Sequence, residues 1–409
     1  SSEGFQSAVR RIQKIGLSNL VAAWDNQGSR SPSVSPHLVD SADFCIRICL
    51  RGLAMLNAES RGRGRYSHFR EGGSMNNPVP APVLPYRMNW TYSVTIVLIH
   101  LLGFLALIPY LFSWTAFWVF VIGIHVFGQG ITIGYHRLLT HRSFKCPKWV
   151  ERVFAILGIC SMQDTPARWV SVHRQHHVHS DEIPDPHSPR VTFFWSHMGW
   201  LMWVNRQTYS AAGLEKFAKD LLRDRFYMRL ELNPFQQFKY LMGQFVVFFA
   251  AGFGISFLFS PELSAAVQLG ASMVTWGVIM RVIAVWHITW SVNSLSHMFG
   301  YRNYETNEGS RNNWLVALLS VGEGWHNNHH EDPSAASVQH RWWELDISYY
   351  EIKLLEMVGL ASDVIPPRQM RHGHRPASKA TDKSGSAGTG EANPPSDVTD
   401  PTVTKKIPA

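Results

Sequence analysis

The chain has 409 residues, of which only 17% are charged and 12% are aromatic, and it carries 20 histidines and a formal net charge of +8. The basic residues do not gather into a patch with base-reading motifs, which excludes nucleic acid as the expected partner and favours membrane phosphates. The four cysteines lack zinc-ribbon spacing and are too few for a disulfide scaffold, so we expect reduced thiols at Cys45, Cys49, Cys146 and Cys160.

Both ends of the chain are polar. Residues 1–74 are rich in Ser, Arg and Gly, and we expect them to be mostly disordered, within an N-terminal extension that covers residues 1–87. Met75 opens a plausible natural start, and an Arg-rich, acid-poor targeting peptide is the rival interpretation of the segment before it. Residues 368–409 consist largely of Ser, Gly, Thr, Pro and Lys, which predicts a disordered tail.

Four apolar runs lie between these ends, at about residues 92–112, 114–135, 240–259 and 263–286. Each approaches the ~20 residues that a helix needs to cross a membrane. Short turns join the first run to the second and the third to the fourth, which predicts two helical hairpins. Lys and Arg crowd the polar regions that follow each hairpin, while the two turns carry none. By the positive-inside rule, we expect both polar regions and both termini to be cytoplasmic.

Three histidine clusters stand in the polar regions: HRLLTH at 136–141, HRQHH at 173–177 and HNNHH at 326–330. On a helix, positions i, i+3 and i+4 share a face, so the second and third clusters should each aim three imidazoles in one direction. His136 and His141 are roughly 140° apart on an ideal helix and should reach two neighbouring ions rather than one. Asn293 and His297 add an i, i+4 pair at the end of the fourth apolar run.

Nine imidazoles exceed what one ion uses, and zinc sites usually hold four ligands, often with thiolate. Imidazole suits several metals, but a dinuclear redox site beside hydrocarbon favours iron and oxygen activation. Isolated histidines at 100, 125 and 340 are excluded as ligands, and His179, His187, His197 and His287 are assigned structural or outer roles. Candidate outer partners of the ligands are Asp181, Asp185, Glu323 and Asn312.

Five sequence segments resemble motifs of membrane fatty acid desaturases of the stearoyl-CoA desaturase type. They are GYHRLLTHRSF, WVSVHRQHHVHSDEIPDPHSPR, FFWSHMGW, TWSVNSLSHMFG and GEGWHNNHH. The resemblance spans about residues 88–365, within an expected desaturase domain at 88–367. It implies an all-α integral membrane fold, with four transmembrane helices and a helical cytosolic cap that holds a di-iron site. The implied iron ligands, which are also the implied catalytic residues, are His136, His141, His173, His176, His177, His297, His326, His329 and His330, with Asn293 holding one iron through a water.

The same resemblance implies two Fe²⁺ ions, dioxygen as co-substrate, and a cis double bond introduced at carbon 9 of a saturated acyl chain. Animal acyl-CoA desaturases carry Arg or Arg-Lys where this chain has Ser171 and Val204-Asn205, so a lipid-linked acyl chain competes with an acyl-CoA as the substrate. Arg168 and Arg206 lie nearby as possible substitutes. The tail shows no haem-binding or flavin-binding signature, so a separate donor is expected, either ferredoxin or a cytochrome b-type haem protein with its reductase.

We expect Trp169 and Trp200 to line the acyl tunnel and Phe120 and Ile124 to form its closed end. A di-iron membrane hydroxylase, ketolase or alkane monooxygenase is the alternative function, because such enzymes share similar boxes. A histidine-rich metal transporter is a further class. It is disfavoured because its ionisable residues should line a path through the bilayer midplane, whereas these boxes cluster at the helix ends.

Overall fold

The computed structural model describes residues 79–371, so most of the predicted extension and of the predicted tail lies outside the described residues. Residues 79–87 already pack against the rest. Val83 is buried, and the backbone amide of Val204 donates to the carbonyl of Arg87. At the other end, the short helix α17 (Arg368–Arg371) continues past the expected boundary at 367. Residues on both sides of the expected domain at 88–367 therefore also pack against it.

Within residues 79–371, four helices are long and apolar enough to cross a membrane, which agrees with the expected number. The first is α4 (Trp90–Gly103), followed by the short turns η2 (Phe104–Leu107) and η3 (Pro109–Leu111); the second is α5 (Trp114–Gln129) with the π-helix η4 (Gly130–Thr140). The third is α11 (Gln236–Phe259), and the fourth runs through α12 (Leu263–Val274), the π-helix η6 (Thr275–Met280) and α13 (Arg281–Met298). Large apolar side chains such as Ile122 and Val247 face outward, as a lipid environment requires.

The fourth helix is longer than hydropathy predicts, since it continues from residue 286 to Met298. Its last three turns are polar, and Ser294, Ser296 and His297 are buried there against other parts of the protein. Hydropathy ends the run early because these turns contact protein rather than lipid. This extension carries His297 to the level of the other histidine clusters.

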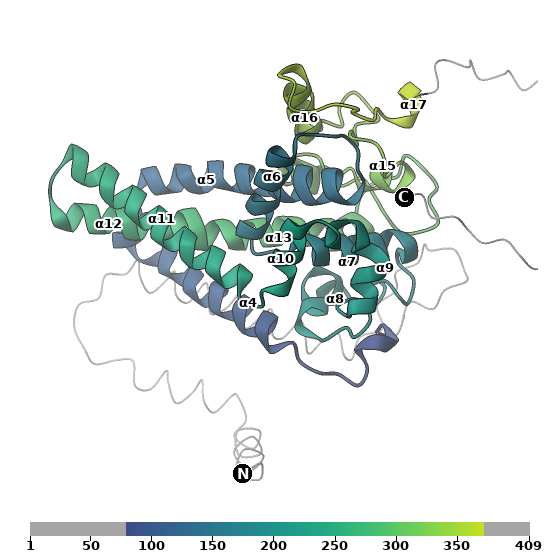
Figure 1. Ribbon diagram of the computed structural model, residues 1–409, viewed down its shortest axis with the longest axis horizontal. Helices are drawn as coiled ribbons and strands as arrows, with labels where there is room; N and C mark the ends of the chain where they lie inside the picture. The colour runs from purple at the N-terminus through teal and green to yellow at the C-terminus, as the bar shows by residue number, and fades with distance from the viewer. Residues whose placement is uncertain (1–78, 372–409) are drawn as a thin grey trace, which may run out of the picture. The chain divides into compact units, whose positions relative to one another are not determined.

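The polar segments form a helical cap at one end of these four helices. Its elements are α6 (Lys148–Cys160), α7 (Pro166–His179), α8 (Phe193–His197), η5 (Gly199–Met202), α9 (Ala211–Leu222), α10 (Arg225–Leu232), α14 (Trp314–Leu319), α15 (His326–Glu331) and α16 (Ile347–Met357), with η1 (Ala81–Val83) and α17. Figure 1 shows α11 and α12 meeting at the end opposite α7, α8 and α9. Residues 79–371 contain no β-strand, which agrees with the all-α expectation.

The π-helix η4 changes the geometry of the first histidine cluster. The backbone amide of His141 donates to the carbonyl of His136 at 3.1 Å, an i to i+5 bond in place of the usual i to i+4 bond. The wider turn places residues five apart on nearly the same face. The backbones of η4 and α6 meet at a glycine pair, where a Cβ on Gly130 would lie 2.4 Å from the amide nitrogen of Gly158.

A buried guanidinium ties the transmembrane helices to the cap. Arg281 is fully buried, donates to the carbonyls of Gly277 and Cys160, and also contacts the side-chain oxygen of Gln244. Its guanidinium carbon lies 3.8 Å from the centre of the Phe127 ring. Arg281 therefore joins α13 to α6, α11 and α5 at one point. A cation at this depth is tolerated because all its neighbours are polar acceptors or an aromatic face.

The close packing of η4 on α6 yields a stability prediction. Gly130→Ala should destabilise the protein by about 1–3 kcal/mol, because a methyl group there overlaps the α6 backbone. Gly128→Ala is the matched control, since a Cβ at Gly128 meets nothing within 4 Å. Thermal unfolding in detergent measures both. Equal melting temperatures for the two variants would contradict this close packing.

Candidate metal centre

The structure brings all nine predicted histidines together in two adjacent groups. Each residue of a group offers one ligand atom, and within a group these atoms lie within 4.8 Å of one another. The larger group consists of His136, His141, His173, His177 and His329, and the smaller group consists of His176, His297, His326 and His330. The expectation that His136 and His141 reach two different ions is wrong. The π-turn of η4 puts both in the larger group, which an ideal α-helix does not do.

The second and third clusters divide their histidines between the two groups. In α7, His173 and His177 belong to the larger group, while His176 belongs to the smaller group. In α15 the middle histidine, His329, belongs to the larger group, while His326 and His330 belong to the smaller group. The three imidazoles of each HxxHH do lie on one face of the helix, as predicted, but that face spans both groups. Two adjacent ions therefore suit the arrangement better than one.

Carboxylates hold the outer nitrogens of several of these imidazoles. Nδ1 of His136 lies 2.6 Å from Oε2 of Glu323, and Nδ1 of His176 lies 2.9 Å from Oδ2 of Asp185. Nδ1 of His297 lies 3.2 Å from Oδ1 of Asp181. A carboxylate only accepts, so each Nδ1 carries the proton and each Nε2 keeps its lone pair for a metal. The structure thus brings Asp181, Asp185 and Glu323 to the positions expected of outer partners.

The inner nitrogens have the spacing of metal ligands. Nε2 of His329 lies 3.0 Å from Nε2 of His136 and 2.9 Å from Nε2 of His177, and Nε2 of His330 lies 3.1 Å from Nε2 of His326. Two nitrogens bound at right angles to one ion at ~2.1 Å are ~3.0 Å apart. Nε2 of His141 is buried without a hydrogen-bond partner among the described residues. Converging lone pairs and an unpartnered nitrogen fit a bound cation.

Burial also keeps the imidazoles in the form that binds metal. The pKa of His173 and that of His326 are lowered well below their ordinary value, first by burial and then by neighbouring histidines. Burial alone would raise the pKa of Glu323, but His136 and Arg137 lower it to about 2. At neutral pH His173 and His326 are therefore neutral donors, and the Glu323 carboxylate is ionised. This distribution suits a positively charged metal ion.

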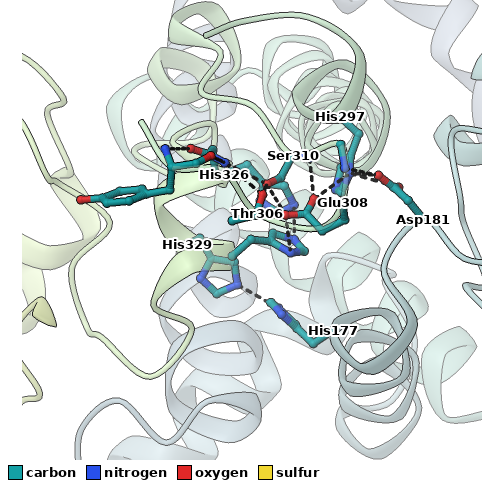
Figure 2. Close-up of polar contacts among 12 residues, drawn as sticks. His177, Asp181, His297, Thr306, Glu308, Ser310, His326 and His329 are labelled. Carbon is teal, nitrogen blue, oxygen red and sulfur yellow. Dashed lines mark hydrogen bonds and ion pairs between the residues drawn. The ribbon is translucent and has the colours of Figure 1, made fainter. Parts of the chain in front are cut away.

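Glu308 is an outer partner that the sequence analysis missed. Figure 2 shows Glu308 of the Thr306–Ser310 loop on one side of His297 and Asp181 on the other side. Its carboxylate lies 3.7 Å from Nδ1 of His330 and 3.9 Å from Nδ1 of His297. Glu308 stands eleven residues after His297 in an irregular loop, so no helical spacing pointed to it.

The remaining predicted outer residues have other roles. The side-chain oxygen of Asn312 accepts from the amides of Asn327 and Asn328, which fixes the start of α15 rather than an imidazole. His187 packs on His176, with ring centres 4.4 Å apart. His197 and His287 hydrogen-bond to each other at 3.0 Å and lie in neither metal group, while His179 pairs with Glu182 at the surface.

An apolar cavity of ≈ 210 Å³ ends at the histidines. Its lining residues come from α5, η4, α7, α13, the end of α14, the segment after it and the start of α15, and include His136, His173 and His326, with Asn293 beside them. Trp169 lines it, as expected, and so does Ile124, which was expected at its closed end. Trp200 and Phe120 are not among its lining residues; Trp200 packs beside His187, and Phe120 packs on Trp276. The cavity follows α5 toward Val121 instead.

Comparison with known proteins agrees with this geometry. A model of the fatty acid desaturase family matches residues 112–354. The chain is 40% identical to the sn-1 stearoyl-lipid 9-desaturase of Synechocystis sp. over 68% of this chain and 81% of that protein. It is 37% identical to the sn-2 palmitoyl-lipid 9-desaturase of Nostoc sp. (70% and 94%) and 39% identical to the acyl-CoA 5-desaturase AL21 of Anemone leveillei (64% and 75%).

The contact between Asp185 and His176 yields a prediction on metal content. Asp185→Asn should lower metal affinity by about 10–100-fold, because the substitution removes the charge and one of the two acceptor oxygens behind His176. Purified protein loaded with Fe²⁺ and dialysed against a graded chelator series measures the loss. Glu182→Gln, in the same loop but on the surface, is the matched control. Unchanged metal retention by Asp185→Asn would remove Asp185 from the supporting shell.

Proposed function

Because this chain belongs to the fatty acid desaturase family, we propose that it inserts a cis double bond at carbon 9 of a saturated acyl chain carried by a membrane lipid. Two hydrogens leave adjacent methylenes; with dioxygen, two electrons and two protons, the products are the alkene and two waters. The observation that carries this proposal is the apolar cavity that ends at histidines of both groups. A methylene has no polar handle, so a narrow apolar passage must position it.

Two ferrous ions are the metals that we propose for the two histidine groups. When bound, they would activate dioxygen, which is the oxidant that breaks the unactivated C–H bonds. Imidazole also binds zinc and copper, so the choice of iron follows from this chemistry rather than from ligand type. The protein's own residues bring nine imidazoles together, with a buried carboxylate behind His136, His176 and His297. Asn293 lines the cavity one turn before His297, which supports its assignment to the same centre.

The arginines near the cap support a lipid rather than coenzyme A as the acyl carrier. Arg168 is paired with Glu231 at 2.7 Å, and Arg206 donates to the backbone carbonyls of Leu84 and Pro85. Neither is therefore free to replace the missing phosphate ligands. Ser171, where acyl-CoA desaturases carry Arg, is fully buried. The similar relatives include a lipid desaturase and an acyl-CoA desaturase by name. The preference for a lipid carrier therefore follows from Arg168, Arg206 and Ser171 and not from the names.

Carbon 9 as the position of the new double bond is supported by the printed names of the relatives, two of which are 9-desaturases. We place the cap and both termini in the cytoplasm, because the connections at 108–113 and 260–262 contain no Lys or Arg and the cap contains many. Electrons then come from a separate cytoplasmic donor, either ferredoxin or a cytochrome b-type haem protein with its reductase. This donor binds to the cytoplasmic surface of the cap.

Expression in a host that lacks its own 9-desaturase tests the function. We expect 9-monoenoic acyl chains in the membrane lipids by gas chromatography with mass spectrometry, and none from the His177→Ala variant. His179→Ala is the matched control, because His179 pairs with Glu182 outside both metal groups and should retain activity. Hydroxylated or keto products in place of alkenes would contradict desaturation and support the hydroxylase or ketolase alternative.

Gly128 should limit the acyl length that the cavity accepts. It lines the cavity, and a Cβ there meets nothing within 4 Å, so a larger side chain can project into the space without disturbing the fold. Gly128→Leu should shift the product ratio toward shorter chains by about tenfold, because each lost methylene contact is worth ~1–3 kcal/mol. Gly243→Leu on α11, which is equally open but remote from the cavity, is the control. An unchanged chain-length profile would contradict the assignment.

A further inference from the structure

The cavity does not end inside the protein at its far end. Val121 and Leu319 both line it, yet they are 38% and 51% exposed. Val121 lies on α5, and Leu319 is the last residue of α14, so the wall of the cavity reaches the surface between these two helices. Ser320 and Val321 follow directly and line the same wall. The cavity therefore opens sideways, along the flank of the second transmembrane helix.

The surface around this opening is apolar. On α5, the exposed neighbours of Val121 are Trp118, Ile122 and Val126. On α14, Trp314, Leu315 and Leu318 are exposed near Leu319. On α16, Leu354 and Met357 are exposed, and so is Val358 directly after the helix. Side chains of this kind, on a helix that is long and apolar enough to span a membrane, contact lipid rather than water. Tryptophans at the edge are typical of the membrane interface.

We propose that the acyl chain of an intact membrane lipid enters the cavity sideways from the bilayer, through the opening between Val121 on α5 and Leu319 on α14. This inference rests on the proposed function and names its route of access. The lipid slides its chain between the two helices while its polar part stays at the membrane surface. The helices α14 and α16 lie in the interface and frame the opening.

The charges near the opening agree with a lipid substrate. The cavity lining includes no Lys or Arg, and its ionisable members are Glu323 and four histidines. One of these is His125, whose Nε2 contacts Oε1 of Glu351 on α16 at 2.6 Å. A carboxylate at the edge repels the phosphates of coenzyme A but tolerates the ester and hydroxyl groups of a lipid. His125 thus forms the polar edge of the opening without binding metal.

Obstruction of the opening tests this route. Val121→Trp and Leu319→Trp should each lower desaturation of bilayer lipids by about tenfold or more, because an indole fills the gap through which the chain must pass. Ile122→Trp and Leu315→Trp are matched controls, since both positions are exposed on the same helices but lie outside the cavity lining. Equal iron content and thermal unfolding across the four variants separate obstruction from misfolding.

Two further outcomes decide between explanations. In the desaturase-deficient host, full activity of both tryptophan variants at the opening, with an active wild type, would overturn the lateral route and leave the function intact. A wild type that forms no alkene would overturn the function itself. If shorter acyl chains restore activity to Val121→Trp, the side chain has only shortened the cavity, and the route is again contradicted. Persistent loss with chains of every length is the result that the proposal requires.

Discussion

The structure depends on the hydrogen bonds that carboxylates accept from the outer nitrogens of buried imidazoles. Glu323 and Asp185 fix the ring orientation and the proton position of His136 and His176, and so direct their lone pairs inward. Two nitrogen lone pairs that face one another at about 3 Å repel unless a proton or a metal ion lies between them. Metal binding and folding of this cap are therefore coupled, and the carboxylates supply most of the balancing negative charge.

The transmembrane helices place these ligands by their length and pitch. The π-turn at the end of α5 brings His141 round to His136, and the polar extension of α13 carries His297 up to the cap. Gly130 and Gly158 let η4 and α6 approach closely enough for this, and Arg281 ties four helices together below it. Membrane anchoring and metal ligation thus use the same helices, so the centre stands beside the lipid from which we propose the substrate comes.

Much of this was predictable from the sequence, because the signals are local. Hydropathy predicts four helices, and HxxHH spacing predicts which imidazoles share a face. Sequence spacing does not reveal backbone geometry that departs from an ideal helix, as at His136 and His141. It also does not reveal a ligand partner that a distant loop supplies, as Glu308 does. Phe120 and Trp200 were expected at the tunnel, whereas Val121 and Ile124 line the cavity on α5, because tertiary packing turns Phe120 against Trp276.

The central claim is that nine imidazoles hold two iron ions in one catalytically active centre. Mössbauer spectroscopy of active, purified protein, combined with iron and protein analysis, tests it most directly. The account predicts two irons per chain in two nitrogen-rich environments, one for the five-histidine group and one for the four-histidine group. Desaturation by protein that contains a single iron per chain, or zinc without iron, would contradict it.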